Sequence, residues 1–393
     1  MSTPSTVPKI LFALGTRPEA IKLAPVIRAA QAYDDWRVVV CNTGQHVELL
    51  RPVLQALELT PDITLDTMRA GQGLAAQVGA GLDRFDEVLA RERPDRVVVQ
   101  GDTTTTLTAA LAAFYRGIAI DHVEAGLRTN DLRSPFPEEM NRVLVTRLSD
   151  LHLAPTPRAK AALLREGVSE QNVEVTGNTV VDAVKAALGR LERLEGHQGP
   201  PNDVRELAEL APERPVVFVT GHRRESFRGG LEAICDGIDR LAKWHPEIEI
   251  VYPVHLNPNV QQAVRTRLLG RSNVRLMSPV GYLGAIWLLR RAKFVITDSG
   301  GLQEEAPELA KPALVTRAVT ERPEALEAGY AVLVGYDVDA LVETAHTWLV
   351  DPEAYARVVP KHNPYGDGRA GLRCVSAIRR RLDLTYETEA TWR

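Results

Sequence analysis

Short runs of hydrophobic residues alternate with longer stretches of helical periodicity along most of the chain. The runs in the first half are apolar at nearly every position, which is typical of parallel strands covered by helices on both faces. Amphipathic segments separate them at Pro18–Ala30, Gln72–Arg91 and Thr104–Tyr115. The pattern predicts βαβ units, with strands at Lys9–Leu14, Arg37–Cys41, Arg96–Gln100, Ile118–Val123, Leu151–Ala154 and Val173–Val175.

The alternation stops at Glu195–Asn202, EGHQGPPN, a polar segment with glycine and proline that is typical of a linker. It then resumes, with strands expected at Pro215–Thr220, Ile248–Tyr252, Val274–Leu276, Phe294–Thr297, Ala313–Val315 and Ala331–Val334. We predict two doubly wound Rossmann-like α/β domains, residues 1–195 and 203–362, facing each other across a cleft. Residues 363–393 are expected to form a C-terminal helix.

Composition narrows the class of protein. The 393 residues are 45% hydrophobic and 25% charged, as in globular proteins, and the net charge of −4 offers no basic field for nucleic acid or a membrane surface. Three widely spaced cysteines predict neither a zinc site nor a disulfide framework. The sequence shows no signal peptide and no membrane-spanning run, so a cytoplasmic location is expected.

The first polar motif after a predicted strand is GTRPEAIK, which begins at Gly15. Gly15 permits a tight turn, and Pro18 suits the first turn of a helix. Arg17 and Lys22 then lie near a helix N-terminus, where backbone N–H groups favour anions. A capped helix with surface charges would give the same pattern. The loop has neither the dinucleotide fingerprint nor the P-loop pattern, so neither type of nucleotide site is indicated.

Carboxylates follow two further strands of the first domain. Asp102 lies in QGDTTTT, where one Thr or Asp would be enough to cap the next helix and four threonines exceed that need. Glu124 follows the next strand, and Glu138 and Glu139 open a helix after two prolines, where an acidic pair also suits the helix dipole. If Asp102, Glu124 and Glu138 converge, their crowding can raise one pKa and provide an acid and a base in one site.

The second domain carries cationic and glycine-rich strand ends. TGHRRESF places His222 beside two arginines, a plausible phosphate clamp. PVHLNP places His255 at the next strand end. TDSGGLQEEA leads into a helix, so the N–H groups near Ser299 can cradle a diphosphate, and Glu305 can accept hydrogen bonds from ribose hydroxyls. TERPEAL adds Arg322. The phosphate partners are cations and helix ends, so no metal is required.

Together these motifs resemble the non-hydrolysing UDP-N-acetylglucosamine 2-epimerases. The motifs that match that family, in its order and across nearly the whole chain, are GTRPEAIK, GDTTTT, HVEAGLRT, SPFPEEMNR, TGNTVVDA, TGHRRESF, YPVHLNPNV, TDSGGLQEEA, TERPEA and HNPYGDG. The resemblance implies a B-type glycosyltransferase-like fold whose C-terminal helix crosses back to the first domain. It also implies a homodimer that reversibly converts UDP-GlcNAc to UDP-ManNAc, a precursor of cell-surface polysaccharides, without a cofactor.

The resemblance also implies roles for individual residues. The uridine-diphosphate site would comprise Arg17, His222, Ser299, Gly300, Gly301, Glu305 and Arg322. The sugar-side and catalytic positions would be Lys22, Asp102, Glu124, Glu138 and His222. Some relatives bind a second UDP-GlcNAc as an activator, and the matching region here includes Gln45, His46, Arg223 and His255. Ala285 stands where many members carry an aromatic residue near the uracil pocket, which leaves Tyr282 to pack against that base.

The C2 proton of an N-acetylhexosamine is not next to a carbonyl, so its direct abstraction is very difficult. Elimination of UDP from C1 while a base removes that proton gives a 2-acetamidoglucal, and re-addition after protonation on the other face inverts C2. This route needs proton-transfer groups near C2 and positive charge on the diphosphate. Asp102, Glu124 and Glu138 are expected to transfer protons, with neither face assigned to one of them, in a site assembled by domain closure.

Four other functions remain open at this point. A retaining glycosyltransferase would use the same architecture, although the carboxylates of the first domain argue against it. A hydrolysing epimerase would release free ManNAc and UDP. A third alternative is a family member that acts on a modified sugar such as a 2,3-diacetamido uronate. A fourth is a non-catalytic regulator that binds the nucleotide sugar without changing it.

Overall fold

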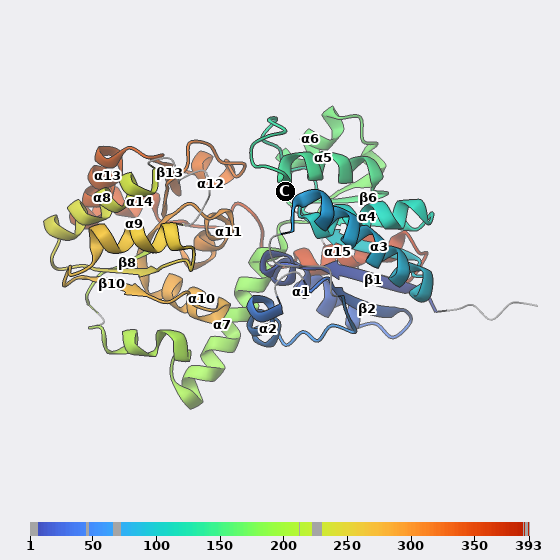
Figure 1. Ribbon diagram of the computed structural model, residues 1–393, viewed down its shortest axis with the longest axis horizontal. Helices are drawn as coiled ribbons and strands as arrows, with labels where there is room; N and C mark the ends of the chain where they lie inside the picture. Colours follow the sequence, from blue (N-terminus) through green and yellow to red (C-terminus); the bar gives the residue numbers. More distant parts are fainter. Residues whose placement is uncertain are drawn as a thin grey trace, which may run out of the picture. The chain divides into compact units, whose positions relative to one another are not determined.

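The structure is a computed structural model that describes residues 7–44, 47–65, 72–211, 213–221, 230–387, 389 and 392. Contacts between Cα atoms divide the chain into two compact units (Figure 1). Unit 1 comprises Met1–Ala183 and Tyr365–Arg393, and unit 2 comprises Val184–Pro364. The division falls within helix α7, Thr179–Gln198, whereas the sequence predicted a linker at Glu195–Asn202, a segment whose first four residues belong to this helix.

Unit 1 contains a seven-stranded sheet whose strand pairs are all parallel, in the order β3-β2-β1-β4-β5-β6-β7. The chain leaves β1 to one side and returns on the other side at β4, so these two strands flank the topological switch point. The strands are β1 (Lys9–Leu14), β2 (Arg37–Asn42), β3 (Ile63–Thr64), β4 (Arg96–Gln100), β5 (Ala119–Val123), β6 (Leu151–Ala154) and β7 (Val173–Val175).

Helices cover both faces of this sheet, as the apolar strands require. One layer contains α3, α4 and α5, whose apolar side chains share a core with β1, β2, β4 and β5, and the other contains α1, which packs against α2 and α15. The helices are α1 (Arg17–Gln31), α2 (Val47–Ala56), α3 (Leu74–Glu92), α4 (Thr104–Tyr115), α5 (Glu138–Leu148), α6 (Pro157–Arg165), the short η1 (Glu170–Asn172) and α15 (Ala370–Arg380).

Unit 2 repeats the plan with a six-stranded sheet, also parallel throughout, in the order β10-β9-β8-β11-β12-β13. Its switch point lies between β8 and β11. The strands are β8 (Val216–Thr220), β9 (Glu249–Pro253), β10 (Val274–Met277), β11 (Ala292–Thr297), β12 (Ala313–Val315) and β13 (Ala331–Leu333).

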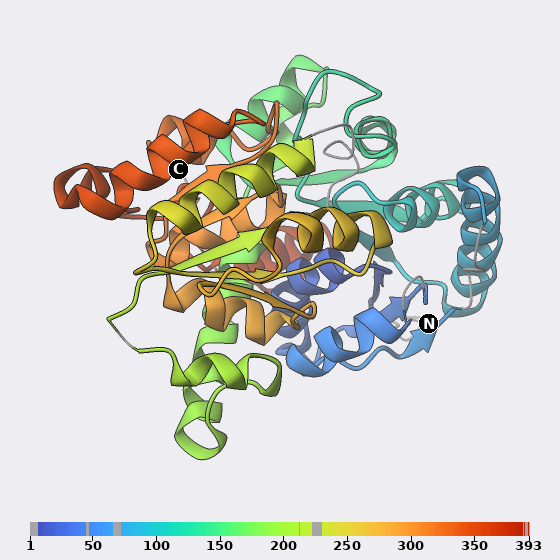
Figure 2. The same ribbon diagram turned by 60° about the vertical axis from the view of Figure 1, so that its left-hand side comes forward.

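One core of unit 2 joins its sheet to α8, α9 and α13, and both ribbon views show α8 and α9 side by side (Figures 1 and 2). On α10, Trp287 donates to Glu195 of α7 at 2.9 Å. The helices are η2 (Asn202–Glu209), α8 (Gly230–Trp244), α9 (Pro258–Leu268), α10 (Tyr282–Arg291), α11 (Gly300–Glu305), η4 (Ala306–Leu309), α12 (Glu324–Glu327), α13 (Val338–Val350) and α14 (Pro352–Val358).

The predicted α/β class and its parallel sheets are confirmed. Most expected strands agree with the observed ones to within one or two residues, and the two-residue β3 was not expected. Among the described residues, none of the helices combines the length and the apolar character needed to cross a membrane.

A buried arginine binds one end of the C-terminal helix α15 to unit 1. The Arg379 guanidinium donates to both carboxylate oxygens of Asp35, at 2.7 and 2.6 Å. Its Cζ atom lies 3.8 Å from the ring centre of Tyr33 and 4.9 Å from that of Trp36. The bidentate pair and the two cation–π contacts fix the far end of α15 on the loop after α1.

Asp182 of α7 binds the other end of the same helix. Its carboxylate accepts hydrogen bonds from Gly371 N at 2.9 Å and from Ala370 N at 3.2 Å, in the first turn of α15. Asp182 belongs to the motif TGNTVVDA, for which no catalytic role was predicted. Its two hydrogen bonds give the motif a structural role, because they satisfy N–H groups that the helix itself leaves unpaired.

We expect Asp182 to make the stability of the fold depend on pH. Burial raises the pKa of its carboxyl from 3.8 to about 6, against the opposing effect of the two backbone donors. Because the folded-state pKa is the higher one, this group stabilises the fold fully below about pH 4, and that stabilisation is lost as the pH rises through about 6. At about 1.4 kcal/mol per pKa unit, the loss is about 3 kcal/mol.

Since asparagine does not titrate, the Asp182→Asn variant should gain stability relative to the wild type as the pH rises from about 4.5 to 7.5, measured as the difference in urea midpoints. Asp367→Asn is a control whose difference should stay constant over this range, because the Arg373 hydrogen bond lowers the pKa of the Asp367 carboxyl and keeps it ionised in both states. A difference for Asp182→Asn that stays constant over this range would contradict the assignment.

Candidate functional site

The loops that follow β1 and β4 pack closely at the carboxyl edge of the unit 1 sheet. A Cβ atom placed on Gly15 would lie 2.1 Å from Thr43 Oγ1 and 2.3 Å from Thr105 Oγ1, so the approach of these hydroxyls requires glycine. The two hydroxyls are themselves 3.3 Å apart. Gly15 therefore serves close packing as well as the tight turn that the sequence predicts.

Glu19, which is fully buried on α1, connects these two loops. One carboxylate oxygen accepts hydrogen bonds from Gly15 N at 3.0 Å and Thr16 N at 2.6 Å. The other accepts from Thr103 Oγ1 at 2.6 Å and Thr106 Oγ1 at 3.2 Å. Burial raises the pKa of Glu19, and the hydrogen bonds from Thr103 and Thr16 oppose that rise. The network explains why more than one threonine is needed after β4.

The sequence analysis missed Glu19. The available signal was the capping box, in which the Thr16 side chain accepts from Glu19 N and Glu19 returns a bond to the Thr16 backbone. That pattern alone accounts for one loop and gives no sign that the same carboxylate reaches the threonines after β4.

Glu124 follows β5 and is held by two donors from neighbouring elements. Lys22 Nζ of α1 donates to one carboxylate oxygen, and Gln100 Nε2 at the end of β4 donates to the other. All three side chains are buried. Glu124 has a φ of 64°, an uncommon conformation for a residue with a side chain. A Cβ atom on Gly101 would lie 3.7 Å from Glu124 Oε2, so this carboxylate lies beside the backbone next to Asp102.

Asp102 is held by α5. Arg142 donates to Asp102 Oδ2 through Nε at 3.1 Å and also through Nη2, and Asn141 Nδ2 donates to the Asp102 carbonyl at 2.8 Å. The third guanidinium nitrogen of Arg142 donates to Glu139 at 2.8 Å. Arg142 and Asn141 were quoted within a motif but were given no role by the sequence analysis.

The two acidic residues that open α5 have different surroundings. Glu139 is buried, and its second oxygen accepts from Thr129 N at 2.9 Å and Asn130 N at 3.0 Å, so it closes the loop before the helix. Glu138 is half-buried. The structural task falls on Glu139, which leaves Glu138 as the more accessible member of the pair.

The histidines of β5 and β6 do not titrate near neutral pH. His122 Nε2 lies 2.7 Å from the Gly101 carbonyl, which only accepts, so this nitrogen carries the proton. Burial lowers the pKa of His122 to about 3 and that of His152 to about 4. The carboxylates, rather than these histidines, are therefore the side chains suited to proton transfer here.

Arg17 is the first residue of α1 and is exposed. No hydrogen bond or ion pair links it to another residue within the described part of the chain. An exposed guanidinium at a helix N-terminus adjoining the switch point suits an anionic ligand.

In unit 2, the predicted diphosphate residues follow β11 at the switch point. Ser299 caps α11, and its hydroxyl accepts from Leu302 N at 3.5 Å. Gly300 is buried against an arginine, since a Cβ atom there would lie 2.6 Å from Arg322 Cζ. Glu305, in the same short helix, is buried and has an exposed fraction of 8%.

Arg322 is tied to acidic residues of its own unit. Its Nε donates to Glu304 at 2.6 Å, and its Nη1 donates to Glu321. Arg317 adds a 2.8 Å bond to the other oxygen of Glu321. Arg322 therefore supports the glycine turn, and part of its positive charge is neutralised within unit 2.

His255 follows β9 and is exposed, with Nδ1 accepting from Asn257 N at 3.1 Å. Tyr282 is buried at the start of α10, and Ala285 is partly exposed on the same helix. Four other predicted residues lie outside the described part of the chain: Gln45, His46, His222 and Arg223.

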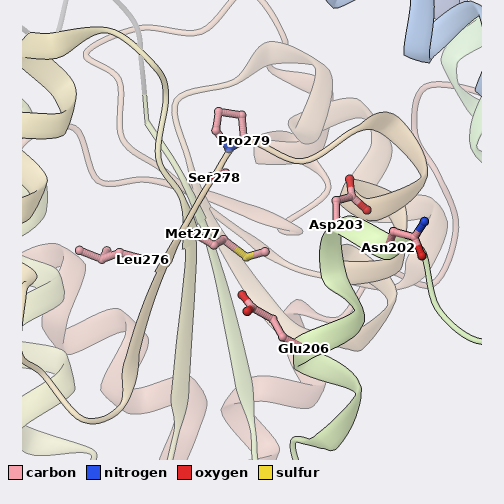
Figure 3. Close-up of a pocket in the computed structure, with 7 residues that line it drawn as sticks. All are labelled: Asn202, Asp203, Glu206, Leu276, Met277, Ser278 and Pro279. Atoms are coloured by element: carbon pink, nitrogen blue, oxygen red, sulfur yellow. The ribbon is translucent and has the colours of Figure 1, made fainter.

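A cavity of about 410 Å³ lies in unit 2 at the carboxyl end of β10, against η2 (Figure 3). Its polar lining includes Asp203 and Glu206, and Asp203 accepts from Gly281 N at 2.6 Å. Carboxylates at this position would repel a diphosphate. None of the predicted substrate residues lines the cavity. In the described ranges, no group of three or more His, Cys, Asp or Glu side chains is arranged to hold a metal ion.

Comparison with known proteins agrees with the resemblance seen in the motifs. A family model described as UDP-N-acetylglucosamine 2-epimerase matches residues 28–379. A probable UDP-N-acetylglucosamine 2-epimerase of Ralstonia nicotianae is 48% identical over 374 residues, covering 94% of this chain and 98% of the relative.

Solved structures agree in fold. UDP-GlcNAc 2-epimerase from Neisseria meningitidis, bound to UDP-GlcNAc, gives a TM-score of 0.91 at 41% identity, covering 95% of this chain and 100% of that one. A Staphylococcus aureus MnaA–UDP structure gives 0.90 at 38% identity, covering 98% and 100%. The glycotransferase of kitacinnamycin gives 0.60 at 16% identity, covering 96% and 100%, and shares the fold alone. The expected glycosyltransferase-like fold is thereby confirmed.

Proposed function

Because this chain belongs to the UDP-N-acetylglucosamine 2-epimerase family, we propose that it interconverts UDP-GlcNAc and UDP-ManNAc by inverting the configuration at C2. It is an epimerase, and therefore an enzyme of the isomerase class. The observation that best supports this substrate and reaction is the pair of fixed carboxylates, Asp102 and Glu124, at the switch-point edge of unit 1. The three cysteines of the chain are free thiols, as expected in the reducing environment of the cytoplasm.

The proposed reaction begins with elimination. A carboxylate takes the C2 proton, the C2–H electron pair forms the C1=C2 bond, and the C1–O pair leaves with UDP. A second acid then protonates C2 on the opposite face while UDP adds back to C1. Asp102, Glu124 and the accessible Glu138 are the proposed proton-transfer groups. They differ in their surroundings, which suits one chain providing both a base and an acid.

Positive charge and N–H donors would stabilise the departing diphosphate. We assign this task to Arg17, to His222, and to the backbone of Ser299, Gly300 and Gly301, with Glu305 accepting from the ribose hydroxyls. Arg322 would act chiefly by supporting the glycine turn that it packs against. Lys22 would hold Glu124 in place on the sugar side.

We also propose a homodimer. Large apolar side chains are exposed on neighbouring helices of unit 1: Phe114 and Tyr115 end α4, and Met140 and Leu144 lie one turn apart on α5. Exposed apolar side chains on two adjacent helices favour a second protein copy as their partner. Sedimentation velocity of the wild type and of Leu144→Glu measures this directly, and a wild type that sediments as a monomer would rule the proposal out.

A second UDP-GlcNAc as an activator is a further proposal, with Gln45, His46, Arg223 and His255 as its binding residues. Of these four, only His255 belongs to the described residues, and its exposed ring is accessible to a ligand. If the activator binds, small amounts of UDP-GlcNAc will speed the conversion of UDP-ManNAc. A rate that does not respond to added UDP-GlcNAc would exclude it.

The function is tested by incubating the protein with UDP-GlcNAc in D₂O and following the sugar by NMR. We expect UDP-ManNAc carrying deuterium at C2. Asp102→Asn should lose about 10²–10⁴ of the rate, because it removes a proton-transfer group, while calorimetry should show that UDP still binds. Release of free ManNAc would indicate a hydrolysing enzyme, and transfer of the sugar would indicate a glycosyltransferase. If no reaction occurs, the protein either acts on a modified sugar or binds the nucleotide sugar without catalysis.

A further inference from the structure

The Asp102 carboxylate is bound asymmetrically. Both donors that reach it come from Arg142, and both bind Oδ2. Within the described residues, no donor binds Oδ1. The Asp102 side chain is 24% exposed, whereas that of Arg142 is 5% exposed. Arg142 is thus the more buried partner, and the Asp102 side chain keeps part of its surface exposed.

Arg142 is itself fixed by a carboxylate that cannot move easily. Glu139 accepts from Arg142 Nη1 at 2.8 Å and from the backbone N–H groups of Thr129 and Asn130 at 2.9 and 3.0 Å. The Glu139 side chain is 1% exposed. Because a guanidinium is planar and its donors have fixed directions, anchoring one edge of it determines where the other edge points.

The backbone around Asp102 is held as well. Asn141 donates to the Asp102 carbonyl at 2.8 Å, His122 donates to the Gly101 carbonyl at 2.7 Å, and Thr106 donates to the Gln100 carbonyl at 2.6 Å. Both the main chain and one oxygen of the side chain are therefore positioned before any ligand arrives. Such preorganisation raises rates because the reacting atom needs no further ordering.

We propose that Arg142 is a positioning residue that holds Asp102 by Oδ2 and leaves Oδ1 as the atom that exchanges a proton with the substrate. This inference rests on the proposed epimerase function. In the elimination direction, Oδ1 takes the C2 proton, the C2–H electrons form the C1=C2 bond, and the C1–O electrons leave with UDP. A second acid then protonates C2 on the opposite face while UDP adds back to C1, and Oδ1 itself delivers a proton to C2 only when the other epimer is the substrate.

The test compares Arg142→Gln, Arg142→Lys and Arg128→Gln with the wild type, using kcat and KM for UDP-GlcNAc. Arg128 is a matched control because it is equally buried and binds Glu166 with two bonds, at 2.6 and 2.9 Å, but does not bind Asp102. Circular dichroism and thermal unfolding report whether each variant folds.

For Arg142→Gln we expect kcat to fall about 10²-fold with little change in KM, because positioning is lost and substrate affinity is not. Arg142→Lys keeps the charge but not the fork of donors, so kcat should fall in this variant as well, again with little change in KM. Arg128→Gln should change neither kcat nor KM.

If Arg142→Gln behaves like Arg128→Gln, or if it raises KM with kcat unchanged, the positioning role is wrong. If it does not fold, the kcat and KM of Arg142→Lys decide. In an Asp102→Asn background, Arg142→Lys should lower kcat little further, and a full additive loss would overturn the inference. A wild type that puts no deuterium into C2 would instead defeat the proposed function, so the two failures are distinguishable.

Discussion

The candidate site of unit 1 depends on one buried carboxylate. Glu19 accepts two backbone N–H groups from the loop after β1 and two hydroxyl groups from the segment after β4. These loops flank the point where the sheet reverses its winding direction, and strand pairing alone does not fix their conformations. A polar group without partners would be costly at this depth, so the four donors and the carboxylate require one another.

Two further ion pairs stabilise the same edge of the sheet. Lys22, one turn along the same helix as Glu19, holds Glu124, and Arg142 holds Asp102. In each pair a buried cation approaches the carboxylate from the protein side. Each cation offsets the negative charge of its carboxylate, so two carboxylates can be held at the same edge of the sheet. Proton transfer then depends on which oxygen of each is accessible.

Much of this arrangement was predictable. Apolar strands and helical periodicity gave the two parallel sheets, and the polar motifs at the strand ends marked Asp102, Glu124 and Ser299. The partners were harder to foresee. Arg142 lies forty residues from Asp102 in sequence, and no local pattern connects them. Glu138 and Glu139 are adjacent acidic residues, and the sequence does not show which way each side chain leaves the helix. The structure distinguishes them, because Glu139 accepts hydrogen bonds from the backbone N–H groups of Thr129 and Asn130.

The central claim is that Glu19 fixes the two loops on which proton transfer at C2 depends. Glu19→Gln tests it most directly, because an amide presents N–H donors to groups that are themselves donors. The measurement is the rate of deuterium incorporation at C2 of UDP-GlcNAc in D₂O, by variant protein whose folding has been verified by circular dichroism. We expect this rate to fall at least about tenfold, the effect of one misplaced catalytic contact. Exchange at the wild-type rate would contradict it.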